Sequence, residues 1–274
     1  MSIDRRRAHD AFAAYVAPYD PSNRRIALKI DHTYRVAGLC DRIARSLGMG
    51  TDEVDLAWLC GLLHDIGRFE QVRRWDTFRD AASTSHALLG CEVLFGPRER
   101  LGVPVDTAGT EPVARIRDFL DDDAEDGLVR TAIAVHSDFR IPEGLDERTR
   151  TFANVLRDAD KIDILRTIQA ESPEVIIGCD EQALLKSPLS DEATRAFDAR
   201  RCMLREERRV PADYLVGFAC FAFELAYPKS REIMRSQGYL TALLERPFGI
   251  EGQFRDPHTR SELARMAALL ETWL

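Results

Sequence analysis

The sequence of 274 residues lacks several patterns that would place it in familiar classes of protein. No apolar run approaches the roughly 20 residues of a membrane span. The amino terminus, Met-Ser-Ile-Asp-Arg-Arg-Arg, lacks the apolar core of a secretory signal. Six cysteines are scattered without a Cys-x-x-Cys pair, which favours buried, reduced thiols over a disulfide framework. These absences predict a cytoplasmic protein with no membrane partner.

Excess positive charge is also missing, because the formal net charge is -8. A general nucleic-acid binder needs an excess of Lys and Arg to hold phosphate backbones, so we expect no stable nucleic-acid binding. The sequence contains neither a Gly-x-Ser-x-Gly turn nor a glycine-rich phosphate loop. A serine nucleophile of that type and a P-loop nucleotide site are therefore excluded.

The alternation of β-branched and polar residues that is typical of strands is scarce, whereas helical periodicity recurs along the chain. The sequence therefore predicts an all-α protein. At 45% hydrophobic and 31% charged residues, a single domain over residues 1–274 is expected. Its motif-bearing core is placed at about residues 22–170, with a helical carboxy-terminal extension at about residues 190–274.

Local signals predict where several helices begin and end. Ser22 or Asn23 is expected to cap a helix that runs past His32, and Gly67 is expected to end the helix that begins near Thr51. Residues 102–111 are rich in Gly, Pro and Thr and are expected to form a mobile connection. Residues 171–190 are expected to be irregular, with three or four helices following in residues 191–274.

The most informative pair is His64-Asp65, which ends an apolar helical run. Leu56, Leu59, Leu63 and Ile66 follow the spacing of one helix face and lead directly to this pair. Other imidazoles and carboxylates flank it along the chain, namely His32, His86, His136 and Asp160. Neutral imidazole nitrogens and ionised carboxylate oxygens are the ligands of first-row divalent metals, so the sequence predicts a metal site.

The sequence around these residues resembles that of a known protein family over roughly residues 25 to 170. It comprises Leu-Leu-His-Asp-Ile-Gly-Arg-Phe at 62–69, Ser-His-Ala-Leu-Leu-Gly at 85–90, Ala-Ile-Ala-Val-His-Ser at 132–137 and Arg-Asp-Ala-Asp-Lys-Ile-Asp at 157–163. In this order the motifs resemble the H…HD…H…H…D pattern of the HD superfamily of metal-dependent phosphohydrolases. The resemblance implies an HD-domain helical bundle with additional carboxy-terminal helices.

The resemblance also implies which residues bind metal. His32 matches the first ligand of the family, His64 and Asp65 match the paired signature, and Asp160 matches the terminal aspartate. His86 and His136 match the two additional ligands of the binuclear branch. Two divalent metal ions are therefore expected, drawn from Mn, Fe, Mg, Ni, Co or Zn, with Asp65 as their bridge and as a catalytic residue.

The substrate implied by the resemblance is a small, nucleotide-like phosphorylated molecule. Lys161 is expected to act as a catalytic residue and to reach a substrate phosphate. Arg68, Arg73 and Arg79 belong to a basic cluster after the signature, and guanidinium groups suit bidentate phosphate contacts. We therefore expect these three arginines to bind substrate. The sequence does not indicate an oligomeric state.

Several alternatives stay open. His86 follows a candidate capping pair, so it could merely interact with the end of a helix. Asp158 competes with Asp160 for the terminal ligand position. Some HD-superfamily proteins resemble this ligand set yet use mixed-valent di-iron and O₂, so a di-iron oxygenase is the alternative enzyme, which oxygen dependence would reveal. A regulatory module that keeps the fold without turnover is the third alternative.

Overall fold

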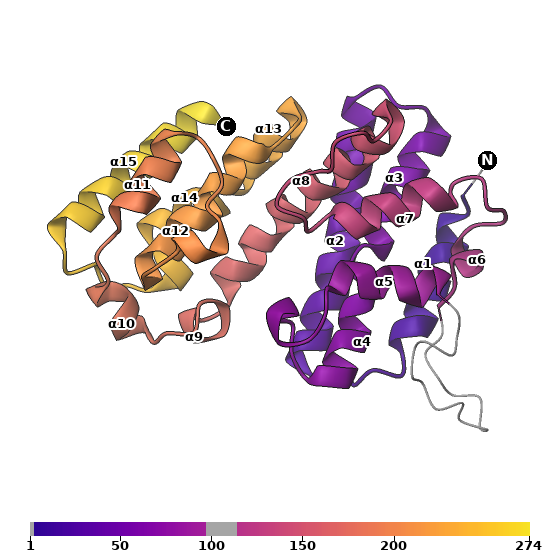
Figure 1. Ribbon diagram of the computed structural model, residues 1–274, viewed down its shortest axis with the longest axis horizontal. Helices are drawn as coiled ribbons and strands as arrows, with labels where there is room; N and C mark the ends of the chain where they lie inside the picture. Colours follow the sequence, from indigo (N-terminus) through magenta and orange to yellow (C-terminus); the bar gives the residue numbers. More distant parts are fainter. Residues whose placement is uncertain (1–2, 97–113) are drawn as a thin grey trace. The chain divides into compact units, whose positions relative to one another are not determined.

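The structure, a computed structural model, describes residues 3–96 and 114–274 (Figure 1). Within these ranges every regular element is a helix and no strand occurs, so the prediction of an all-α fold is confirmed. The connection expected over residues 102–111 lies outside the described residues. The chain divides into two compact units, Met1–Asp160 and Lys161–Leu274, and the single-domain assignment of residues 1–274 stays a prediction.

The amino-terminal unit contains the helices that carry the predicted site. These are α1 (Arg5–Val16), α2 (Arg24–Ser46), α3 (Thr51–Leu63), α4 (Ile66–Trp75), α5 (His86–Phe95), α6 (Ile116–Phe119), α7 (Asp126–Val135) and the first part of α8 (Glu147–Ala170). Helix α2 packs along α3, α4 packs on α5, and α5 packs on α7 (Figure 1). The buried faces of these helices form the core, and they bring segments that are distant in sequence to one place.

Asn23 caps the second helix, because its Oδ1 accepts a hydrogen bond from the backbone N–H of Arg25 at 3.0 Å. This is one of the two caps that the sequence predicted. Helix α2 continues unbroken past His32, which its tertiary contacts bury to 1% exposure.

The carboxy-terminal unit is also helical. It contains α9 (Pro173–Ile176), α10 (Glu181–Lys186), α11 (Asp191–Asp198), α12 (Pro211–Ala219), α13 (Pro228–Gln237), α14 (Tyr239–Glu245) and α15 (Pro257–Trp273). Helix α14 packs on α15 and on α12, which also packs on α11. Residues 171–190 therefore hold two short helices rather than irregular chain, and residues 191–274 hold more helices than the three or four expected.

All six cysteines lie within the described residues and are free, and five of them are buried. This arrangement agrees with the expectation of reduced core thiols. Burial raises the pKa of Cys60 to about 12 and that of Cys91 to about 11, because a thiolate would lose its hydration there. No helix in the described ranges is long and apolar enough to cross a membrane.

Candidate metal centre

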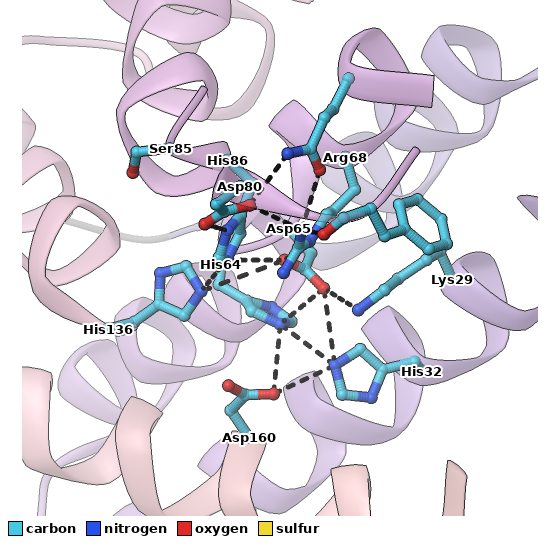
Figure 2. Close-up of polar contacts among 12 residues, drawn as sticks. Lys29, His32, His64, Asp65, Arg68, Asp80, Ser85, His86, His136 and Asp160 are labelled. Carbon is cyan, nitrogen blue, oxygen red and sulfur yellow. Dashed lines mark hydrogen bonds and ion pairs between the residues drawn. The ribbon is translucent and has the colours of Figure 1, made fainter. Parts of the chain in front are cut away.

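The structure brings the six predicted metal ligands together in the amino-terminal unit (Figure 2). They come from five places in the fold: α2, the junction of α3 and α4, the first residue of α5, the residue after α7, and α8. Five of the six are almost completely buried, with 4% exposure or less, and the Asp160 side chain is 20% exposed. Polar groups buried together in this number need partners that compensate for their lost hydration, and the hydrogen bonds and ion pairs described below provide them. The six residues are His32, His64, Asp65, His86, His136 and Asp160.

The central pair lies at a junction between two helices. Helix α3 ends at Leu63 and α4 begins at Ile66, so His64 and Asp65 occupy the break. The prediction that Gly67 ends the helix is wrong, because Gly67 lies inside α4. A Cβ atom at this glycine would lie 2.3 Å from the carbonyl oxygen of His86 and 2.5 Å from the backbone nitrogen of Gly90. Gly67 therefore permits the close approach of α4 to α5, which carries a further predicted ligand.

Three of the imidazoles are oriented through Nδ1. The Nδ1 of His64 lies 2.7 Å from the carbonyl oxygen of Gly61, and that of His136 lies 2.7 Å from the carbonyl oxygen of Ile133. The Nδ1 of His86 lies 2.7 Å from Oδ2 of Asp80. Because carbonyl and carboxylate oxygens only accept, these contacts place the proton on Nδ1 and leave Nε2 with its lone pair. This is the tautomer that a metal ligand needs.

The Nε2 atoms gather in two pairs. Nε2 of His86 lies 3.1 Å from Nε2 of His136, and Nε2 of His32 lies 3.3 Å from Nε2 of His64. Burial lowers the pKa of His86 and of His136 to about 4, so both rings are neutral near pH 7. Two lone pairs then face each other at 3.1 Å, an unfavourable contact unless a cation lies beside them. This donor set fits a divalent metal ion.

The carboxylate of Asp65 faces both histidine pairs (Figure 2). Its Oδ2 lies 3.6 Å from Nε2 of His32 and 3.5 Å from Nε2 of His64. Its Oδ1 lies 3.5 Å from Nε2 of His86 and 4.0 Å from Nε2 of His136. Each oxygen of one carboxylate thus faces a different pair of imidazoles, which is the arrangement required of a bridging ligand.

Asp160 completes the pair formed by His32 and His64. Its Oδ1 lies 3.2 Å from Nε2 of His32 and 3.9 Å from Nε2 of His64. Of the two aspartates that competed for this position in the sequence, Asp160 is therefore the one placed beside the histidines. We call His32, His64, Asp65 and Asp160 the first half-site, and Asp65, His86 and His136 the second half-site. Ligand atoms of His32, His64 and Asp160, and separately of His64, Asp65 and His136, lie within 4.8 Å of one another.

Both carboxylates of the centre are ionised. Burial by itself would raise the pKa of Asp65, but the positive charges of Lys29 and Arg68 outweigh it and hold this pKa well below its usual range. The pKa of Asp160 is likewise lowered, because the hydrogen bond with His32 outweighs its burial. Histidines that are neutral and carboxylates that are ionised are the states in which these groups bind metal.

Three residues that were not predicted from the sequence support the centre. Lys29 places Nζ 2.5 Å from Oδ2 of Asp65. Asp80 accepts the hydrogen bond from His86 already described, and its Oδ1 accepts from Nη1 of Arg68 at 3.0 Å. Arg157 donates from Nη1 to the carbonyl oxygens of Val135 at 3.1 Å and His136 at 3.3 Å, so it fixes the end of α7. Only Lys29 had a sequence signal, because it precedes His32 by three residues and so lies on the same helix face.

Of the predicted substrate residues, Arg68 lies at the centre, with Nε 3.5 Å from Oδ1 of Asp65. Its Nη1 donates to the carbonyl oxygen of Phe78 at 2.6 Å and to Oε1 of Gln71 at 2.8 Å. Arg73 instead forms a two-pronged ion pair with Glu70, at 2.9 and 2.7 Å.

The remaining predicted substrate residues lie in different settings. Arg79 is exposed, and its backbone N–H donates to Oγ1 of Thr77 at 3.1 Å. Lys161 is the first residue of the carboxy-terminal unit, and its Nζ lies 2.6 Å from Oε2 of Glu224. The roles of Arg73, Arg79 and Lys161 toward substrate stay predictions.

A sequence model of one protein family, the HD domain, matches residues 30–165 of the chain. The matched range contains all six residues of the two half-sites, from His32 to Asp160. Searches of curated proteins and of solved structures each found no significant match.

Proposed function

The chain belongs to the HD domain family, a family of metal-dependent phosphohydrolases, and from this premise we propose that it is itself such an enzyme. The proposed reaction is hydrolysis of a phosphoester or phosphoanhydride in a small, nucleotide-like substrate. HD domains bind divalent metals, and the proposed centre holds two of them. The first ion would be held by the first half-site and the second ion by the second half-site, with Asp65 shared.

The observation that carries this proposal is the division of the Asp65 carboxylate between two histidine pairs. Oδ2 faces the pair whose Nε2 atoms lie 3.3 Å apart, and Oδ1 faces the pair whose Nε2 atoms lie 3.1 Å apart. A protein that used the fold only as a scaffold would have no need of four buried imidazoles, three of which turn an Nε2 lone pair inward. The geometry therefore favours an enzyme over a regulatory module.

Divalent ions in the two half-sites would supply a Lewis acid for phosphoryl oxygens and lower the pKa of a water molecule that attacks phosphorus. The protein's own residues perform the remaining tasks. Asp80 keeps the proton of His86 on Nδ1, so that Nε2, which faces Asp65, retains its lone pair. Arg68 presents a guanidinium beside the same carboxylate, where it would bind and neutralise a phosphate group.

The proposal is tested by an anaerobic activity screen with Mn²⁺ over nucleotides, cyclic dinucleotides, dinucleoside polyphosphates and sugar phosphates. At least one phosphate ester or anhydride should be cleaved without O₂. Asp65→Ala should abolish the cleavage and the binding of both ions, because no other carboxylate within residues 3–96 and 114–274 is placed to replace the bridge. Asp31→Ala is the matched control, since Asp31 is exposed although it adjoins His32.

The opposite outcome is equally specific. If no phosphate compound is hydrolysed, and the iron-loaded protein consumes O₂ in the presence of a phosphonate or polyol, then the di-iron oxygenase is the correct assignment. Full binding of both ions by Asp65→Ala would contradict the bridging role.

A further inference from the structure

Lys29 contacts a carboxylate oxygen of the centre, and metal binding by that oxygen would change this contact. Its Nζ lies 2.5 Å from Oδ2 of Asp65, the same oxygen that faces His32 and His64. The Lys29 side chain is only 13% exposed, and its ammonium lies 5.7 Å from the centre of the Phe78 ring. The ammonium therefore stands at the ligand atom through which Asp65 would bind the first ion (Figure 2).

Arg68 stands in the corresponding place at the other oxygen. Its Nε lies 3.5 Å from Oδ1 of Asp65, and its guanidinium carbon lies 5.7 Å from the centre of the same Phe78 ring. This Nε is buried and makes no hydrogen bond. Lys29 and Arg68 thus flank one carboxylate and one aromatic ring, and we call them the Lys29–Arg68 pair.

The charges around the centre do not balance once two ions are bound. Asp65, Asp80 and Asp160 contribute three negative charges, and the Lys29–Arg68 pair contributes two positive charges. Two divalent ions would add four positive charges, which leaves a surplus of three with neutral histidines. Such a surplus in a largely buried place favours the binding of an anion, and the doubly charged phosphate group of a substrate would neutralise two of the three charges.

We propose that Lys29 is a phosphate-binding residue of the substrate site, an inference that rests on the proposed function. In the protein without ions, Asp65 holds the ammonium. A divalent ion held by the first half-site would repel the Lys29 ammonium from Asp65, and the flexible lysine stem would let the ammonium turn to phosphoryl oxygens. Phe78 keeps the ammonium at the centre during this exchange through a cation–π contact.

A different role for Lys29 makes the opposite prediction about metal. If Lys29 only oriented Asp65, its removal would weaken Mn²⁺ binding and leave phosphate binding to the loaded protein unchanged. If Lys29 is displaced by the ion, its removal leaves Mn²⁺ binding as tight as before or tighter, because a competing cation is gone. Metal binding and phosphate binding therefore separate the two roles.

The experiment compares wild type with Lys29→Met, which removes the charge and keeps the length, and Lys29→Arg, which keeps the charge. Lys186→Met, at an exposed lysine of α10, is the matched control. Mn²⁺ content is measured by equilibrium dialysis. The affinity of the Mn²⁺-loaded proteins for inorganic phosphate is measured by titration calorimetry.

Lys29→Met should bind inorganic phosphate roughly ten- to a hundredfold more weakly than wild type, the effect of losing one charged hydrogen bond. Its Mn²⁺ content should stay at the wild-type level. Lys29→Arg should keep phosphate affinity within about threefold of wild type, and Lys186→Met should match wild type.

Two results would overturn the inference for different reasons. Equal phosphate affinity in Lys29→Met and wild type, with wild type binding phosphate, refutes the role of Lys29 and leaves the proposed hydrolase intact. Failure of Mn²⁺-loaded wild type to bind phosphate at all refutes the proposed function together with the inference.

Discussion

The carboxylate of Asp80 offers a sharp test of how the second half-site is built. Its Oδ2 accepts from Nδ1 of His86 at 2.7 Å, and its Oδ1 accepts from Arg68 at 3.0 Å and from Nε2 of Gln71 at 2.9 Å. All the partners of this carboxylate are donors. In Asp80→Asn one of the two oxygens becomes an NH₂ group, so on one side a donor faces a donor.

The expected loss follows from this mismatch. If the amide oxygen turns to Arg68 and Gln71, His86 loses the acceptor that fixes its tautomer, and its Nε2 is no longer held ready for an ion. Removing a carboxylate that orients a ligand histidine typically costs ten- to a hundredfold in metal affinity. That range corresponds to about 1.4 to 2.7 kcal/mol. The loss should fall on the second ion, because the ligand histidine that Asp80 holds, His86, belongs to the second half-site.

Anaerobic equilibrium dialysis against a series of Mn²⁺ concentrations measures both binding steps. Wild type should take up two ions per chain, whereas Asp80→Asn should take up the first normally and the second only at ten- to a hundredfold higher concentration. Asp76→Asn is the matched control, because Asp76 is paired with Arg25 at the surface and its left-handed backbone, with φ of 49°, suits asparagine. Two unchanged binding steps in Asp80→Asn would refute this account of the second half-site.

Three further predictions concern the stability of the scaffold. The pKa of His86 and of His136 is lowered from 6.5 to about 4, so the unfolded chain binds more protons between these values, and the metal-free protein should lose about 2 to 4 kcal/mol of unfolding free energy from about pH 7 to about pH 5. A flat profile in urea denaturation would contradict this. Gly67→Ala should destabilise by about 2 to 3 kcal/mol, since its Cβ would lie 2.3 Å from a backbone oxygen, whereas Gly127→Ala, with open space around it, should be neutral or stabilising by up to about 1 kcal/mol. Equal midpoints of urea denaturation for these two variants would rule out the close approach of α4 and α5 as the reason for a glycine at position 67. Arg157→Met should cost at least about 2 kcal/mol and weaken Mn²⁺ binding, because buried carbonyl oxygens at the end of α7 lose their donor; unchanged stability would show that these bonds do not matter.

The fold class and the central pair could be predicted from local signals, whereas the other four residues of the centre were assigned through the family resemblance. Helical periodicity follows from the sequence alone, and His64-Asp65 stands out because an apolar helix face leads to two polar residues. Asn23 was a candidate cap for the same reason, since capping depends on a side chain and a backbone N–H two residues away.

Gly67 shows where local signals fail. A glycine after a helical run looks the same whether it ends a helix or lets another helix approach. Only the position of the His86 carbonyl oxygen, 2.3 Å from where a Cβ would stand, distinguishes the two cases. The two helices within residues 171–190 were missed for a related reason, because α9 and α10 are too short to show a periodic pattern.

The supporting charges were missed because charged residues in a sequence look like solvated surface. Asp80 lies in a short 3-10 helix between α4 and α5, and its hydrogen bond to His86 depends on how the chain turns before α5. Arg73 was the opposite case. Its partner Glu70 stands three residues earlier on the same helix face, so the ion pair within α4 could have been predicted from the sequence.

The most direct test of the central claim is a crystal structure of the protein grown with Mn²⁺, with anomalous difference density measured at the manganese edge. The account predicts two peaks per chain, one contacting Oδ2 of Asp65 with His32 and His64, and the other contacting Oδ1 with His86 and His136. A single peak, or peaks that do not share Asp65, would contradict it.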